Sequence, residues 1–269
     1  MSALPRSWLF TPGSRPDRFE KAAASAAEAL ILDLEDAVAE DKKAEARGHV
    51  VAFLEARPQI RQQVIVRINP LSRAVGLEDL AALAGLANGP DYLLIPTAEE
   101  PAELALAAKV LDEAGAKARL AALVESARGV ARAAEIAERT PRLAALMFGA
   151  ADYAADMGQQ VGAFQPDFAR ASLVNAAAAG GVAAIDSPFF AIDKPDDLAA
   201  ECRKSRALGF YGKAAIHPAQ LESINDIFSP TAAEREQARR ILEAAPDGVG
   251  VLDGKMIDVA MVRWAKRIV

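Results

Sequence analysis

Cysteine and histidine are almost absent from this sequence, which contains one cysteine and two histidines among 269 residues. Cys202 therefore has no partner for an internal disulfide, and so few soft ligands argue against a zinc site. No apolar run is long enough to span a bilayer, and the N-terminal stretch MSALPRSWLFTPGS lacks the hydrophobic segment of a signal peptide. We therefore expect a cytoplasmic protein that does not enter a membrane.

An excess of basic charge is also lacking. The formal net charge is -6 and the isoelectric point is about 5.2, whereas a nucleic-acid surface needs a basic face. A small anionic ligand held by a few arginines is compatible with this balance. Because 52% of the residues are apolar and 25% are charged, the composition indicates a globular chain, long enough for one large domain or two small ones.

Short β-like runs alternate with longer alanine-rich helical stretches along almost the whole chain. We predict strands at residues 7–12, 29–36, 64–69, 92–98, 119–126, 143–152, 183–190 and 212–218. Eight near-continuous apolar strands, each followed by a helix, are typical of an α/β protein with a TIM (β/α)₈ barrel. A doubly wound open sheet is the main alternative, but the sequence lacks the glycine-rich phosphate turn that normally follows an early strand of that fold.

The end of the sequence does not continue this alternation. We assign residues 1–228 to the barrel and residues 229–269 to a C-terminal extension, in which a glycine-rich stretch precedes one amphipathic helix. Functional groups of a TIM barrel lie at the carboxyl ends of its strands. Polar residues of this sequence gather at the predicted strand ends, and the strand interiors are almost purely aliphatic. The pattern therefore predicts an acidic, magnesium-type pocket at one mouth of the barrel.

The stretch LILDLEDAVAEDKKAEAR places three carboxylates, Asp33, Glu35 and Asp36, at the end of the second strand. Carboxylates this close repel one another, so we expect arginine, lysine or a metal ion among them. One interpretation is a cap on the following helix, provided by Asp36 or Glu40. We favour a supporting role in which Glu35 and Asp36 accept hydrogen bonds from metal-bound water.

Glu125 and Asp152 end adjacent predicted strands and are the best candidates for metal ligands. Two carboxylates, with water and substrate completing an octahedron, suit Mg²⁺. A salt bridge between Glu125 and Arg128 is the alternative explanation for the first carboxylate. Taking both residues together, we favour the metal site.

Two other side chains at strand ends each have two interpretations. Arg67, at the end of the third strand, can pair with the carboxylates of the mouth or grip a substrate carboxylate or carbonyl oxygen with its planar fork. These roles are compatible, and we favour the second. His217 precedes a proline at the end of the eighth strand, and packing and lining the site are equally plausible roles for it.

The loop after the first strand has the features of a phosphate site. Ser14 and Arg15 form a polar loop, and Pro16 starts a helix that carries Arg18. Exposed amides at a helix N-terminus beside two arginines can bind phosphate. A capped surface helix has much the same pattern, so the loop alone is a weak signal.

Seven motifs, read in chain order, resemble one enzyme family: WLFTPGSRPDRFEKA, LILDLEDAVAEDKKAEAR, VRIN, ALVESARGV, FGAADYAADMG, LGFYGKAAIHPAQ and DGKMID. They are similar to the CitE-like, or citrate lyase β-subunit-like, branch of the HpcH/HpaI aldolase superfamily, which includes malyl-CoA and citramalyl-CoA lyases. The match extends from about residue 7 to residue 260. It is specific as a family signal but does not identify the substrate.

The resemblance implies a TIM barrel that assembles as homotrimers or hexamers and binds Mg²⁺ at Glu125 and Asp152. It also implies that Arg67 anchors the substrate, where it would stabilise enolate-like charge on a thioester oxygen. The loop with Ser14, Arg15 and Arg18 would meet the phosphates of coenzyme A. In the family an aspartate of the tail motif acts as the catalytic base in a neighbouring subunit's site, and here it corresponds to Asp258. Without the resemblance, we would interpret Asp258 as the N-cap of the final helix.

One position departs from the family pattern. The family usually has Pro-Lys after the fourth strand, whereas this chain has Pro96-Thr97. The change leaves the expected metal ligands untouched. It removes a positive charge, and it therefore bears on the shape or charge of the pocket for the acid.

The activity that the resemblance implies is a magnesium-dependent carbon–carbon lyase. It would cleave or form a 3-hydroxyacyl-CoA, such as malyl-, citramalyl- or citryl-CoA, and the products would be acetyl-CoA and a 2-oxo acid such as glyoxylate, pyruvate or oxaloacetate. Alternatives are a malyl-CoA-type thioesterase and a citrate lyase β subunit that acts on an acyl-carrier-protein thioester. A non-catalytic protein that binds carboxylates at the same metal site is the least favoured alternative.

Overall fold

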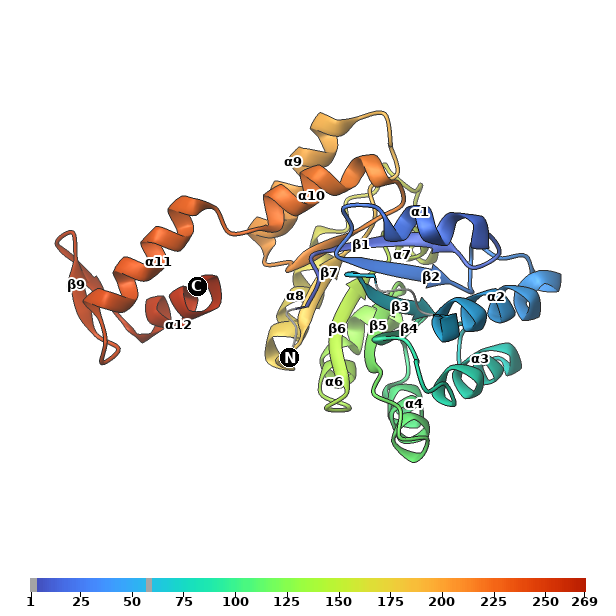
Figure 1. Ribbon diagram of the computed structural model, residues 1–269. Coiled ribbons are helices and arrows are strands. Elements are labelled where there is room, and N and C mark those ends of the chain that lie inside the picture. Colours follow the sequence, from blue (N-terminus) through green and yellow to red (C-terminus); the bar gives the residue numbers. More distant parts are fainter. Residues whose placement is uncertain (1–3, 57–59) are drawn as a thin grey trace. The chain divides into compact units, whose positions relative to one another are not determined.

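Eight parallel strands close into a barrel in the computed structural model, which describes residues 4–56 and 60–269 (Figure 1). The strands pair in chain order, and β8 pairs back onto β1. They are β1 (Ser7–Pro12), β2 (Ala29–Asp33), β3 (Gln63–Arg67), β4 (Tyr92–Ile95), β5 (Arg119–Val124), β6 (Leu143–Phe148), β7 (Ala183–Asp186) and β8 (Gly212–Ala215). The predicted TIM barrel is confirmed.

The first strand ends where the sequence predicted, and the other seven end earlier, which corrects the position of several polar residues. Asp33 is the last residue of β2, so Glu35 and Asp36 lie in the following loop. The chain turns there because the Asp33 carboxylate accepts hydrogen bonds from the amides of Glu35, at 2.9 Å, and Ala37, at 3.2 Å. Asp152, which we expected at the end of the sixth strand, lies in the first turn of a helix.

Alternate side chains of the strands fill the interior of the barrel. On β2, for example, Ala29 and Ile31 belong to the inner cluster, whereas Leu30 and Leu32 are buried on the opposite face of the strand. The inner cluster consists of Trp8, Ala29, Ile31, Ile65, Tyr92, Leu94, Ala121, Leu123, Ala144, Ala145, Met147, Ile185 and Ala214. This alternation continues past the strand ends, and it sets which polar side chains point into the mouth.

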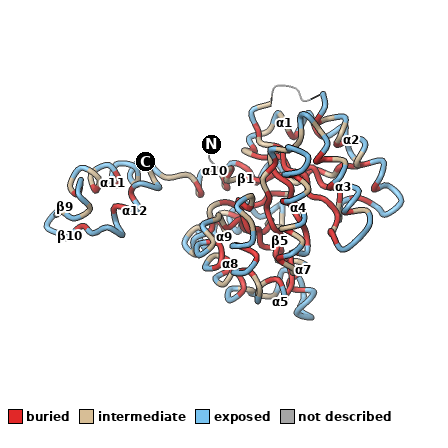
Figure 2. Tube along the Cα trace, turned by 90° about the horizontal axis from the view of Figure 1, so that it is seen from below, coloured by how far each residue is buried: buried red, intermediate tan, exposed pale blue. Residues whose placement is uncertain are grey.

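Helices surround the strands, and buried residues concentrate on the strands and on the sides of the helices that face them (Figure 2). The helices of the barrel are η1 (Pro16–Arg18), α1 (Phe19–Ala23), η2 (Glu40–Lys42), α2 (Lys43–Ala56), α3 (Ala74–Ala84), α4 (Pro101–Glu113), α5 (Ala127–Ala131), α6 (Ala133–Ala137), α7 (Ala150–Asp156), α8 (Asp167–Ala179), α9 (Pro195–Leu208), η3 (Pro218–Gln220) and α10 (Leu221–Phe228). No helix among the described residues has the length and apolar character needed to cross a membrane.

Residues Ile227–Val269 form a second compact unit. It contains α11 (Ala232–Ala244), an antiparallel hairpin of β9 (Gly250–Leu252) and β10 (Lys255–Ile257), and α12 (Val259–Ile268). Its own small core is built from Ala238, Ile241, Ala245, Ile257, Val262 and Ala265. The sequence pattern predicted one helix after a glycine-rich stretch, and the structure adds α11 and the hairpin.

An ion network is buried between β7, β8 and the helices that cover them. Asp186 Oδ2 lies 2.8 Å from Lys213 Nζ and 2.7 Å from Arg170 Nη2, and it accepts a 2.7 Å hydrogen bond from Ser205. Lys213 also contacts Glu201, at 2.5 Å. Burial alone would raise the pKa of Asp186, but the charges of Lys213 and Arg170 outweigh it and hold this pKa below its usual value. The network is internally neutralised, as buried charges require.

We predict that Asp186→Asn destabilises the barrel, because it leaves Lys213 and Arg170 buried without this counter-charge. The free energy of unfolding should fall by about 3–5 kcal/mol, measured by urea denaturation. Asp167→Asn is the matched control, since its pair with Lys204 is half exposed on both sides and should be worth about 1 kcal/mol or less. Equal losses in the two variants would contradict the assigned role of the network.

Candidate active site

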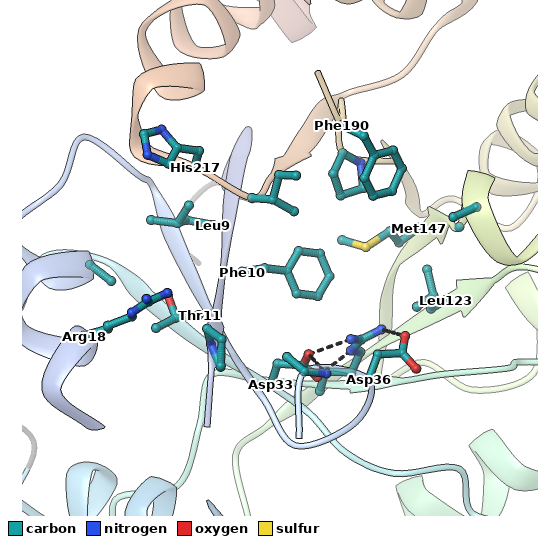
Figure 3. A pocket seen from close by; sticks show the side chains of 18 of the residues that line it. Leu9, Phe10, Thr11, Arg18, Asp33, Asp36, Leu123, Met147, Phe190 and His217 are labelled. Atoms are coloured by element: carbon teal, nitrogen blue, oxygen red, sulfur yellow. Dashed lines mark hydrogen bonds and ion pairs between the residues drawn. The ribbon is translucent and has the colours of Figure 1, made fainter. Parts of the chain in front are cut away.

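The carboxyl ends of the strands surround a cavity of about 950 Å³. Apolar side chains such as Phe10 and Met147 face the same cavity as the acidic residues Asp33 and Asp36 (Figure 3). The charged residues that line it are Arg15, Asp17, Arg18, Lys21, Asp33, Asp36, Arg67, Glu125 and Asp152. The acidic mouth that the sequence predicted therefore coincides with this cavity.

A bidentate ion pair between β2 and β3 lies at the base of this acidic group. Asp33 and Arg67 are register partners, and each follows an inward-facing isoleucine, Ile31 or Ile65, by two residues. The two-residue period turns both side chains into the mouth. Arg67 Nε and Nη2 lie 2.6 Å from Asp33 Oδ1 and Oδ2 (Figure 3). This fork-to-fork geometry fixes the plane of the guanidinium.

The third nitrogen of the guanidinium faces the loop after β2. Arg67 Nη1 lies 2.8 Å from Glu35 Oε2 and 3.1 Å from Asp36 Oδ2, and the guanidinium stacks 5.0 Å from the centre of the Phe10 ring. Burial disfavours the charge, but the carboxylates of Asp33, Glu35 and Asp36 outweigh burial and raise the pKa of Arg67. The positive group expected among the packed acids is therefore an arginine. Of the two roles considered for Arg67, the structure shows the pairing.

The interpretation of the acidic stretch as a helix cap is wrong. The helix η2 begins after Ala39, which makes no side-chain cap, and neither Asp36 nor Glu40 supplies one. Glu40 instead pairs with Arg73, 2.5 Å away. Burial raises the pKa of Glu35 to about 7, and the Arg67 charge only partly opposes this increase. The loop is thus organised around the guanidinium and not around the helix.

Glu125 and Asp152 line the same mouth as Arg67 and face each other through a side-chain hydrogen bond. Glu125 directly follows β5, two residues after the inward-facing Leu123, and only 7% of it is exposed. Burial is the main reason that the pKa of Glu125 is raised to about 8, and the charge of Asp152 adds to it. Burial and the charge of Asp36 raise the pKa of Asp152, and a side-chain hydrogen bond with Glu125 partly opposes the rise.

These two carboxylates have the chemistry of a cation site. Both pKa values are raised mainly by burial and further by neighbouring carboxylates, and the Arg67 charge is already shared by three other acids. A divalent cation would supply the missing positive charge, and two oxygen donors leave positions for water and substrate. No cluster of three or more His, Cys, Asp or Glu side chains suited to a metal ion was found among the described residues. A metal ion at this site would therefore be held by the carboxylates of Glu125 and Asp152.

The alternative explanation for Glu125, a salt bridge to Arg128, is wrong. The Arg128 guanidinium lies 3.9 Å from Glu99 and 3.7 Å from Glu100, and its side chain is largely exposed. Glu125 instead accepts a 2.7 Å hydrogen bond from the backbone amide of Thr97. Its carboxylate is thus held by the neighbouring strand end and directed toward Asp152.

His217 and the loop after β1 border the cavity. Of the two roles considered for His217, the structure shows lining the cavity; the side chain is exposed and not packed, and its Nδ1 accepts a 3.2 Å hydrogen bond from the Ala219 amide. Arg15 and Arg18 also line the cavity, and Arg15 pairs with Asp17 through two contacts of 2.8 and 2.7 Å. The hydroxyl of Ser14 lies 3.5 Å from the Ala37 carbonyl oxygen, and Ser14 is not among the lining residues.

Asp258 belongs to the second compact unit. Its Oδ1 accepts hydrogen bonds from the amides of Ala260, at 2.9 Å, and Met261, at 3.0 Å. Asp258 is therefore the N-cap of α12, as the residues alone indicated. The side chain is exposed, and its second oxygen has no hydrogen bond to these amides.

Sequence reasoning did not identify two positions that contact Glu125. Gly149 is the inward-facing residue after β6, and a Cβ built on it would lie 2.5 Å from Glu125 Cβ. Thr97 contacts Glu125 through its amide and its hydroxyl. The glycine in FGAAD, two residues after the inward-facing Met147, was an available signal for the first. Thr97 stood out only as a departure from a family pattern.

The chain resembles characterised proteins over almost its entire length. Residues 6–218 match the family model described as HpcH/HpaI aldolase/citrate lyase. An L-malyl-CoA/β-methylmalyl-CoA lyase of Cereibacter sphaeroides is 36% identical over 296 aligned residues, which cover 98% of this chain and 93% of the relative. A (3S)-malyl-CoA thioesterase of the same species is 40% identical over 265 residues, covering 94% of this chain and 89% of the relative.

A solved structure with the same fold contains ligands. The protein CitE of Mycobacterium tuberculosis, in complex with magnesium, acetoacetate and coenzyme A, is 35% identical to this chain. The TM-score is 0.79, and the match covers 99% of this chain and 97% of that chain. Because the match covers 99% of this chain, it includes residues after the barrel as well as the barrel itself.

We predict that Mg²⁺ binding strengthens as the pH rises toward 8. Glu125, with its pKa raised to about 8, must lose its proton before it can ligate a cation. Affinity should therefore weaken by about tenfold for each pH unit below that value. Isothermal titration calorimetry at pH 6, 7 and 8, in buffers of different ionisation enthalpy, measures both affinity and proton release. An affinity that is independent of pH, or unchanged in Glu125→Gln, would exclude this carboxylate as a ligand.

Proposed function

The chain belongs to the HpcH/HpaI aldolase/citrate lyase family, and from this premise we propose that it is a magnesium-dependent carbon–carbon lyase acting on coenzyme A esters. It cleaves or forms a 3-hydroxyacyl-CoA such as malyl-, citramalyl- or citryl-CoA, with acetyl-CoA and a 2-oxo acid as the other pair of reactants. One observation carries the proposal: Glu125 and Asp152 face each other beside a guanidinium already neutralised by other acids. The family relationship agrees with the motif resemblance.

Glu125 and Asp152 are the residues proposed to hold Mg²⁺, which supplies Lewis-acid stabilisation of the oxo-acid oxygens when bound. Asp36 lines the same cavity and raises the pKa of Asp152 through its charge, so it is close enough to accept hydrogen bonds from bound water. Glu35 has the same proposed role, and its charge contributes to the raised pKa of Glu125. These two acids also keep the guanidinium in place.

Arg67 is proposed to stabilise negative charge in the reaction. When the carbon–carbon bond breaks, its electron pair moves toward the thioester carbonyl, the hydroxyl loses its proton and the acetyl carbon gains one. The charge that develops on the thioester oxygen needs a fixed positive group nearby. The bidentate pair with Asp33 keeps Arg67 charged and oriented at the cavity wall, which supports this assignment.

Coenzyme A is proposed to bind along the loop after β1. Arg15, Arg18 and Lys21 bring three positive side chains to a cavity whose other charged residues, apart from Arg67, are acidic. Phosphate groups would be attracted to these side chains and repelled by the carboxylates. Ser14, on the same loop, completes the proposed contacts. Coenzyme A bound in this orientation would direct the thioester end of the substrate toward Arg67.

The extension of residues 229–269 is proposed to reach the active site of a neighbouring subunit in a homotrimer or hexamer. Asp258 would exchange the proton on the acetyl carbon, as a base in condensation and as an acid in cleavage. Seven large apolar side chains of the second unit are 39% exposed or more, which supports burial against another chain. They are Val249, Val251, Met256, Val259, Met261, Trp264 and Val269. The cytoplasm is the proposed compartment, since the free Cys202 is consistent with a reducing environment.

The first test is product analysis with purified protein, Mg²⁺ and a panel of malyl-, citramalyl- and citryl-CoA. We predict that acetyl-CoA and a 2-oxo acid appear together in equal amounts, as mass spectrometry would detect. Glu125→Gln should lower turnover by about two orders of magnitude or more. Oxo-acid and Mg²⁺ binding without turnover of any thioester would instead indicate a non-catalytic carboxylate-binding protein. Activity restricted to an acyl-carrier-protein thioester would indicate a citrate lyase β subunit.

Thioester hydrolysis is the second candidate function. It is favoured by the 40% identity to a malyl-CoA thioesterase, compared with 36% to the lyase. The same panel separates the two activities, because hydrolysis releases free CoA and the intact hydroxy acid with no acetyl-CoA.

We predict that two inactive variants restore each other's activity if the site is shared between subunits. Asp258→Asn retains an intact barrel, and Glu125→Gln retains an intact extension. Random assortment in a closed ring makes about one quarter of the sites complete, so a refolded equal mixture should regain about that share of wild-type activity. A mixture of Glu125→Gln with Asp152→Asn is the control and should stay inactive, because every barrel is defective. No recovery in the first mixture, with mixed oligomers verified by mass spectrometry, would exclude Asp258 from a neighbour's site.

A further inference from the structure

Thr97 has a backbone conformation that β-branched residues rarely adopt. Its φ is +48°, and among the described residues only Asp253 shares a positive φ without being glycine. Two heavy atoms on Cβ make this left-handed region unfavourable for threonine. Other interactions must therefore hold the chain in this conformation, and such outliers occur preferentially at functional sites.

The conformation turns two donors of Thr97 toward one oxygen. The backbone amide donates to Glu125 Oε1 at 2.7 Å, and the hydroxyl Oγ1 lies 3.3 Å from the same oxygen. Pairing of the two strand ends resumes at the next residue, where the Ala98 amide donates to the Leu123 carbonyl at 2.9 Å. Thr97 thus interrupts the pairing between the ends of β4 and β5, and both of its donors face the Glu125 carboxylate.

Gly149 borders the same carboxylate from the end of β6. A Cβ on this residue would lie 2.5 Å from Glu125 Cβ and 2.8 Å from Oε2. The φ of Gly149 is -104°, which any residue adopts, so the missing side chain and not the backbone is what this position requires. The Glu125 side chain therefore lies between a donor pair on one neighbouring strand end and a bare backbone on the other.

We infer that Thr97 is a positioning residue that orients the Glu125 carboxylate toward Asp152 for cation binding. The inference rests on the proposed magnesium site. Thr97 anchors Oε1, Gly149 leaves space for Oε2, and the carboxylate makes its side-chain hydrogen bond with Asp152. A ligand held in one orientation before the cation arrives binds it more tightly than a mobile one, since less ordering is needed on binding.

The test compares Thr97→Val with Thr97→Ser by titrating MgCl₂ into each protein in a calorimeter. Valine keeps the shape and removes the hydroxyl, so the Kd for Mg²⁺ should rise about tenfold, whereas serine should stay within about twofold of wild type. The activation constant for Mg²⁺ should rise in parallel in Thr97→Val, with kcat at saturating Mg²⁺ nearly unchanged. Thr140→Val is the matched control, because this threonine lies just before β6, at the opposite end of the strand from the cavity, and accepts a bond from the Arg142 amide.

A second variant approaches the same carboxylate from the other side. Gly149→Ala should raise the Kd for Mg²⁺ at least as much as Thr97→Val, because its Cβ displaces the Glu125 side chain. Thermal unfolding of every variant separates positioning from stability: a lower Tm with wild-type Mg²⁺ affinity in Thr97→Val would overturn the inference. Wild-type protein that binds no Mg²⁺ at all would instead overturn the proposed function on which it rests.

Discussion

The pair of Arg67 and Asp33 is the constraint on which the rest of the site depends. Both side chains point inward because the two-residue period of β2 and β3 continues to the strand ends, and strand register places them opposite each other. The bidentate contact determines the plane of the guanidinium and leaves Nη1 for Glu35 and Asp36. The loop after β2 therefore folds around a positive charge, and that charge is mostly neutralised before any ligand arrives.

Two buried charge groups in this barrel differ in their balance. Around Asp186, Lys213 and Arg170 supply enough positive charge to hold the carboxylate ionised, and every member packs between strands and helices. Around Glu125 and Asp152 burial and like charges prevail, so both pKa values are raised. A neutralised buried network stabilises the fold, whereas two carboxylates in a cavity with too little positive charge around them form a site for a cation. Charge balance, more than burial, separates the structural from the functional group.

Much of the fold was predictable because it depends on local periodicity. The apolar runs located all eight strands, although every strand after the first ends sooner than its run does, as at Asp33, where the carboxylate itself turns the chain. The extension was predicted less well. Its first helix begins with a capping box of Thr231 and Glu234, a signal that the sequence contains and that we did not use. The hairpin of β9 and β10 is only three residues long on each side, too short for a clear alternation.

The sequence by itself determined which chemical groups reach the barrel mouth, since residue type and strand phase are both written in it. It also indicated Asp258 as a helix cap, because capping is a contact between near neighbours. Only the tertiary structure decided how these groups pair. Arg67 pairs with Asp33, and Arg128 does not pair with Glu125. Thr97 adopts a left-handed conformation in which its amide donates a hydrogen bond to Glu125. Such choices depend on distances between residues far apart in the chain, which periodicity does not encode.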